Sequence, residues 1–156
     1  MQPAEQDKTA QTLESRLRLM RIIWAMFLLA VGVYALVGYF AAPAGGAGRR
    51  DEAPAGWVLP LLVLVAVACV LTSIVAKRGF AGRAVAERRP ELMQSGLILG
   101  VALCEAAALF GLVGLLVTGD SYAYVLFAIG AAGILLHFPS RDRLAATYYG
   151  PGGRAS

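Results

Sequence analysis

Glu105 is the residue of this sequence that most directly suggests chemistry, because it lies in the middle of the apolar run ILGVALCEAAALFGLVGLL, residues 98–116. A charged side chain at the centre of a bilayer costs at least about 2.5–3.5 kcal/mol on insertion scales. At 1.5 Å per residue, Glu105 is roughly 15 Å from the end of a helical run, too far to reach the lipid headgroups. We therefore expect Glu105 to be protonated, paired with a neighbouring helix, or exposed to water.

The remaining reactive side chains do not form a recognisable catalytic or metal-binding set. Cys69 and Cys104 both fall inside apolar runs and lack the spacing of metal ligands, so we expect them to pack as small residues. His137 stands at the end of an apolar run, where capping a helix C-terminus is its expected role. No Ser/His/Asp or Cys/His set, H-E-x-x-H motif or phosphate-binding glycine loop is present. The expectation is a protein that is not an enzyme and that has no cofactor and no metal.

These side chains must be positioned by four apolar runs, at residues 22–42, 57–76, 95–118 and 121–138. Each is close to the roughly 20 residues that a membrane-spanning helix requires. Hydrophobic residues make up 58% of the chain and charged residues only 15%, which leaves too little polar chain to cover four such helices in water. The sequence predicts an all-α membrane bundle of four transmembrane helices in one domain, residues 1–156.

The helices are expected at about residues 10–42, 57–77, 91–118 and 121–138, with 139–156 as a flexible tail. Pro90 is expected to begin the third helix, and the first turns of the first helix are amphipathic. A cleaved secretory signal is the main alternative for residues 22–42. Its apolar core is longer than the usual 7–15 residues, however, and follows about 20 polar ones, which favours a retained span.

The basic residues predict the orientation of the bundle. Of the 14 Lys and Arg residues, all except Arg49 and Arg50 fall in the N-terminal segment, in the connection after the second run, or in the tail. By the positive-inside rule, both termini are cytoplasmic. The arginines from Arg83 to Arg89 alternate with acidic residues and have no aromatic residues among them, so nucleic-acid binding is not expected. We expect a multi-pass membrane protein that contacts membrane lipid.

Small residues recur along one face of the third run. At 100° per residue this face consists of Gly96, Gly100, Ala107, Gly111, Gly114 and Thr118, with Cys104 at its edge. It includes a GxxxG at residues 96–100, which lets another helix approach closely. Glu105 lies about 140° from the centre of this face. The third helix is therefore predicted to be two-faced, with Glu105 directed to a different partner or to lipid.

The run ALCEAAALFGLVGLLV resembles the ion-carrying helix of the c-type proteolipids of rotary ATPases. The matching residues are Glu105, Ala108, Leu109, Phe110, Gly111, Leu112 and Val113. The resemblance covers about 20 residues, and the chain lacks the family's glycine-dense partner helix, hairpin arrangement and short polar turn. The same run, with a final Phe-Pro before a basic tail at residues 137–143, also resembles small uncharacterised bacterial four-helix membrane proteins. This resemblance implies a location in the bacterial inner membrane.

These observations leave two hypotheses for Glu105. In the first, Glu105 donates a hydrogen bond within a helical assembly, and the chain is an assembly or accessory component that associates with copies of itself or with another membrane protein. Thr72, Ser73 and Tyr34 are the candidate partners, and Tyr34 is best matched in depth. In the second, which the proteolipid resemblance implies, Glu105 binds or translocates a proton or cation in an oligomer.

Overall fold

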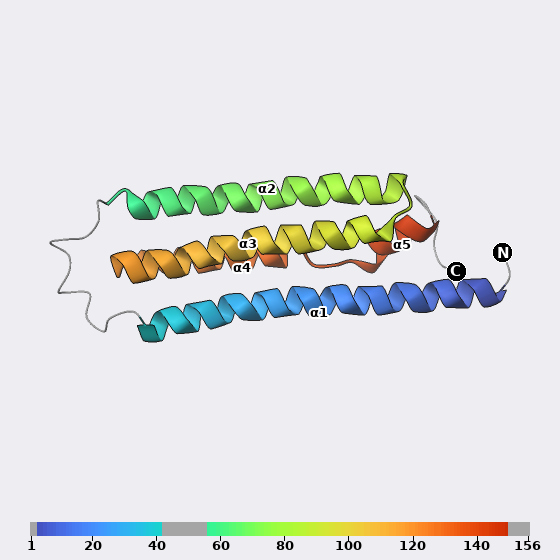
Figure 1. Cartoon of the computed structure of the whole chain (residues 1–156), viewed down its shortest axis with the longest axis horizontal. Coiled ribbons are helices and arrows are strands. Elements are labelled where there is room, and N and C mark those ends of the chain that lie inside the picture. Colours follow the sequence, from blue (N-terminus) through green and yellow to red (C-terminus); the bar gives the residue numbers. More distant parts are fainter. Residues whose placement is uncertain (1–2, 42–55, 150–156) are drawn as a thin grey trace.

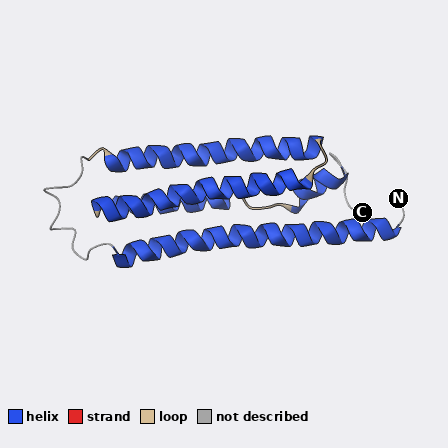
Figure 2. Cartoon of the chain, viewed as in Figure 1, coloured by secondary structure: helices blue, strands red, loops and turns tan. Residues whose placement is uncertain are grey.

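The computed structural model describes residues 3–41 and 56–149, and all regular structure within them is helical (Figures 1 and 2). The order is α1 (Pro3–Ala41), α2 (Val58–Ala86), α3 (Pro90–Thr118), the 3₁₀ turn η2 (Ser121–Ala123), α4 (Tyr124–Leu135) and α5 (Arg141–Tyr149). The helix α3 is central and packs against α1, α2 and α4. The beginning of α1, the end of α2 and α5 lie together at one end of the bundle (Figure 1). The predicted all-α bundle is confirmed.

Three helices are long and apolar enough to cross a membrane: Gln11–Ala41 of α1, Val58–Ala86 and Pro90–Thr118. The fourth is shorter than the predicted 121–138, because residues 121–123 form the 3₁₀ turn η2 and α4 ends at Leu135 and not at Phe138. Pro139 explains this end, since proline disfavours helical backbone in the residue before it and cannot donate a backbone hydrogen bond. The 12 residues of α4 rise only about 18 Å, against a hydrocarbon core of about 30 Å.

The expected basic connection after residue 77 is mostly helix. The helix α2 continues to Ala86, so that Ala84 is buried and Phe80 packs on Gly96 of α3. It ends in a Schellman-type turn, in which Arg88 is left-handed (φ 52°) and the Arg89 amide donates to the Ala84 carbonyl. Pro90 occupies the first turn of α3, as predicted. Hydropathy alone does not predict this extension, because the apolar run ends at residue 76 and charged residues follow it.

The expected flexible tail is also partly helical. Residues 141–149 form α5, in which Leu144 is 1% exposed. Leu144 belongs to the same core cluster as Leu13 and Leu17 of α1. These α1 residues precede the apolar run, and their apolar side chains are partly shielded from solvent by α5. The predicted outer loop with Arg49 and Arg50, and the tail from residue 150 on, lie outside the described residues.

The small-residue face of α3 is buried at Gly96, Gly100, Cys104, Ala107, Gly111 and Gly114. Thr118, at the end of this face, is partly buried. The contacts of this face come from several elements. A Cβ on Gly100 would lie 2.5 Å from the His137 ring, and one on Gly114 would lie 3.2 Å from Leu62 of α2. A glycine of α4 also allows the two helices to come close: a Cβ on Gly130 would lie 2.8 Å from the backbone oxygen of Cys104 in α3. These contacts set the spacing of α3 from α2 and α4.

The substitution Gly130→Ala tests this close approach. The added methyl group meets backbone atoms of α3, which cannot rotate away, so we expect the free energy of unfolding to fall by about 1–3 kcal/mol. The matched control is Gly32→Ala, because no atom lies within 4 Å of a Cβ at Gly32. That variant should be neutral or more stable, since alanine favours helix by up to about 1 kcal/mol. Equal stability of the two variants, measured by unfolding in mixed micelles, would contradict the packing described here.

Candidate functional site

Glu105 is hydrogen bonded to Tyr34. The phenol Oη of Tyr34 in α1 donates to Oε1 of Glu105 in α3 over 2.7 Å. Both side chains are partly buried. Tyr34 was the depth-matched candidate among the three predicted partners. The direction of the bond differs from the expectation, because Tyr34 donates and Glu105 accepts.

The packing of α1 on α3 holds these two side chains together. Val101 and Ala108 of α3 are fully buried, and they share a core cluster with Val31 of α1. On the other side of Glu105, Ile98 and Leu109 are each 40% exposed. Glu105 therefore lies at the edge of the α1–α3 contact, neither in the centre of the bundle nor on its fully exposed side. This position agrees with the two-faced helix that the sequence predicts, with α1 as the second partner.

The other two candidate partners are occupied elsewhere or exposed. The Ser73 hydroxyl donates to the Val70 carbonyl over 2.6 Å and lies 3.3 Å from Sγ of Cys104. Thr72 is exposed on α2. The predicted small-residue packing of Cys104 is consistent with its place between Ser73 and Gly133, where a Cβ on the glycine would lie 2.6 Å from Sγ.

A second polar cluster surrounds the end of α4, where the chain leaves helical structure while still inside the bundle. His137 is fully buried, and its Nδ1 donates to the Gly133 carbonyl over 2.8 Å, because a carbonyl oxygen can only accept. The predicted capping role of His137 is thereby confirmed. Its Nε2 lies 3.4 Å from the Ser73 carbonyl. The histidine thus joins the end of α4 to α2.

Two further side chains complete the cap of α4. Nε1 of Trp24 in α1 donates to the Ile134 carbonyl over 2.7 Å, and Nζ of Lys77 in α2 donates to the Leu136 carbonyl over 2.7 Å. The last carbonyls of a helix have no partner within the helix, and lipid supplies none. Side chains from α1 and α2, together with His137 from the segment that follows α4, therefore stabilise the short α4 by hydrogen bonds at its end.

Sequence reasoning did not identify the roles of Trp24 and Lys77. The available signal was the segment LHFP at residues 136–139, in which a proline stops an apolar helix early. Such a stop implies carbonyl groups that need donors, but the sequence does not indicate which helices supply them.

Among the described residues, no group of three or more His, Cys, Asp or Glu side chains is placed to hold a metal ion.

The chain matches no protein-family profile, no curated protein and no solved structure.

The variant Lys77→Met tests the cap of α4. It keeps the apolar stem of the side chain but removes the donor to the Leu136 carbonyl, so we expect a loss of about 1 kcal/mol in the free energy of unfolding. The neighbouring substitution Arg78→Met is the control, because Arg78 is exposed and forms no ion pair among the described residues. If both substitutions have the same effect on stability, Lys77 does not serve as a cap.

Proposed function

We propose that this chain is an integral membrane protein of the bacterial inner membrane, and that it acts as an assembly or accessory component in which Glu105 is a helix-packing residue. The observation that carries the proposal is the 2.7 Å hydrogen bond from Tyr34 to Glu105. A carboxyl group that is already bonded within the chain contributes to the cohesion of α1 and α3. The proteolipid-like alternative requires the same group to exchange a proton or cation.

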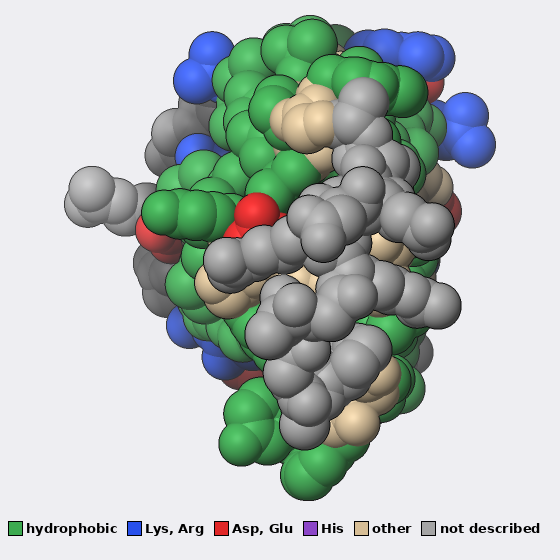
Figure 3. Space-filling view, turned by 90° about the vertical axis from the view of Figure 1, so that its left-hand side faces the viewer, with side chains coloured by type: hydrophobic (Ala, Val, Ile, Leu, Met, Phe, Trp, Pro, Cys, Tyr) green, Lys and Arg blue, Asp and Glu red, His purple; other side chains and the backbone are tan. Residues whose placement is uncertain are grey.

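The membrane location is supported by the distribution of side chains. Large apolar residues are exposed along the sides of α1 and α2, among them Leu29, Phe40, Leu64 and Val75. Figure 3 views the end where α1 ends and α2 begins, and the described side chains there are mostly hydrophobic. In water such a surface would be a liability for aggregation, whereas hydrocarbon solvates it.

The orientation is supported by the basic side chains at the opposite end. Arg16 pairs with Glu91 over 3.0 Å, Arg83 with Glu87 over 3.2 Å, and Arg141 with Glu14 over 3.8 Å. These pairs belong to the beginning of α1, the end of α2, the start of α3 and α5, which together extend the bundle beyond its apolar part. By the positive-inside rule this extension is cytoplasmic, which places both termini inside.

Carbodiimide labelling in liposomes tests the role of Glu105. Under the packing proposal, modification of Glu105 in the wild type is slow, and neither pH nor added sodium changes its rate systematically. The variant Tyr34→Phe should be modified faster, because the bonded oxygen is released. The variant Glu105→Gln identifies the labelled site by mass and should keep the wild-type oligomeric mass in size exclusion.

The opposite result favours ion binding. If Glu105 of the wild type is modified readily, and if the modification decreases as pH rises or as sodium is added, the carboxyl group titrates and is accessible. Tyr39→Phe serves as the control for tyrosine loss, because Tyr39 lies on the same helix but is exposed and contacts Phe40. A change in labelling with Tyr39→Phe would show that the effect of Tyr34→Phe is unspecific.

A further inference from the structure

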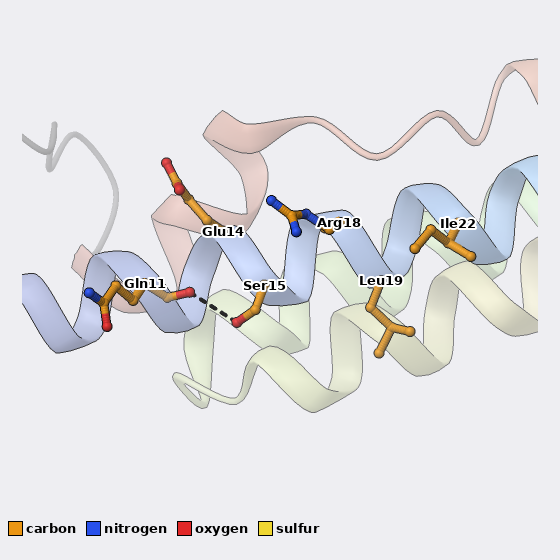
Figure 4. Close-up of a pocket in the computed structure, with 6 residues that line it drawn as sticks. All are labelled: Gln11, Glu14, Ser15, Arg18, Leu19 and Ile22. Carbon is orange, nitrogen blue, oxygen red and sulfur yellow. Dashed lines mark hydrogen bonds between the residues drawn. The ribbon is translucent and has the colours of Figure 1, made fainter.

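The first turns of α1 carry a shallow depression that none of the preceding roles uses (Figure 4). Its six lining residues all come from α1: Gln11, Glu14, Ser15, Arg18, Leu19 and Ile22. The polar and charged residues line the part nearer the N-terminus, and the two apolar residues line the other part. The depression therefore changes from polar to apolar along the helix axis.

Neighbouring contacts indicate where this change lies relative to a membrane surface. The rings of Trp24 and Phe138 meet edge to face with centroids 5.2 Å apart, and the Arg21 guanidinium lies 5.7 Å from the Phe138 centroid. Tryptophan and arginine with apolar stems concentrate at the membrane–water interface. Arg18 lies about 5 Å, and Ser15 about 9 Å, further out than Arg21 along the helix. The polar part of the depression is thus at the level of lipid headgroups.

The apolar part continues into an exposed stripe on the same face of α1. Ile22, Met26 and Leu29 are 50%, 65% and 70% exposed. Their spacing of four and three residues is that of one helix face, and the stripe goes on through Val33, Leu36 and Phe40. An extended acyl chain has an uninterrupted apolar surface from the depression toward the far end of α1.

The charge in the depression is only partly compensated. Arg18 is exposed and takes part in none of the ion pairs among the described residues, unlike Arg16 on the same helix. Glu14 also lines the depression, but its carboxylate faces the Arg141 guanidinium at 3.8 Å. The Ser15 hydroxyl donates to the Gln11 carbonyl over 2.9 Å, so it does not offer a proton to a ligand. The available charged donor is therefore the Arg18 guanidinium, because the Gln11 amide is turned toward the N-terminus, away from Arg18 (Figure 4).

We propose that this depression binds one anionic glycerophospholipid, with the phosphate on Arg18 and an acyl chain along Ile22, Met26 and Leu29. The guanidinium of arginine is well suited to phosphate oxygens, and the positive charge of Arg18, which no ion pair among the described residues compensates, favours an anionic headgroup. The inference rests on the proposed membrane location. It adds a defined lipid site to a surface that would otherwise contact bulk lipid.

Native mass spectrometry of the full chain in detergent tests the proposal, with phosphatidylglycerol and phosphatidylcholine of identical acyl chains added in equal amounts. The wild type should retain phosphatidylglycerol about fivefold over phosphatidylcholine, because both carry a phosphate but only phosphatidylglycerol has the net negative charge that one arginine attracts. Arg18→Gln should reduce this ratio to near one. Arg78→Gln should leave it unchanged, because Arg78 is an exposed arginine of the same end, on α2, next to Lys77.

The outcomes separate this inference from the proposed function. Equal retention of the two lipids by the wild type, or equal losses in Arg18→Gln and Arg78→Gln, would overturn the site. Those results leave the membrane location intact. A chain that remains soluble after cell lysis without detergent would contradict the membrane location itself. Arg18 makes no ion pair within the described residues, so its substitution should leave the thermal unfolding temperature unchanged, which checks that the variant is folded.

Discussion

Polar groups enclosed by apolar helices must find their partners inside the protein, and this constraint determines the arrangement of the bundle. An unpaired polar group in a hydrocarbon environment costs several kcal/mol, which is comparable with the total stability of many domains. The chain meets this constraint at two places. Glu105 of α3 is paired with Tyr34 of α1, and the final carbonyls of α4 receive donors from Trp24, Lys77 and His137.

Both solutions depend on α3 as the central helix. Its small-residue face admits α2 and α4 at short distances, so that the His137 ring fits against Gly100. Its opposite edge meets α1, where the Tyr34 hydroxyl reaches the Glu105 carboxyl. A larger residue at Gly100 would displace the histidine that caps α4. The close packing of α3 and the hydrogen bonds of its neighbours therefore support one another.

The sequence predicted those features that follow from one helix alone. The bounds of α3 follow from Pro90 and from the left-handed Gly119 that caps its end at Thr118. Its two faces follow from the 3.6-residue period. The Tyr34–Glu105 pair could be anticipated as well, because depth in a membrane is a linear function of position along each helix.

Features that depend on tertiary packing could not be predicted from the sequence of a single helix. The extension of α2 to Ala86 is stabilised by the contact of Phe80 with Gly96, residues from two different helices. The helix α5 has a low intrinsic apolar content and owes its place to Leu144, which covers Leu13 and Leu17. Two of the donors to the end of α4, Trp24 and Lys77, come from residues far away in the sequence. Local propensity has no information on any of these contacts.

The measurement that tests the central claim most directly is a double-mutant cycle of Tyr34→Phe and Glu105→Leu, read as free energies of unfolding in mixed micelles. If the two side chains bond within the chain, the double variant loses less stability than the sum of the single variants. The difference should be about 0.6 kcal/mol and at most about 1.7 kcal/mol, the range known for hydrogen bonds between membrane helices. Strictly additive losses would show that the two groups do not interact, and would contradict Glu105 as a packing residue.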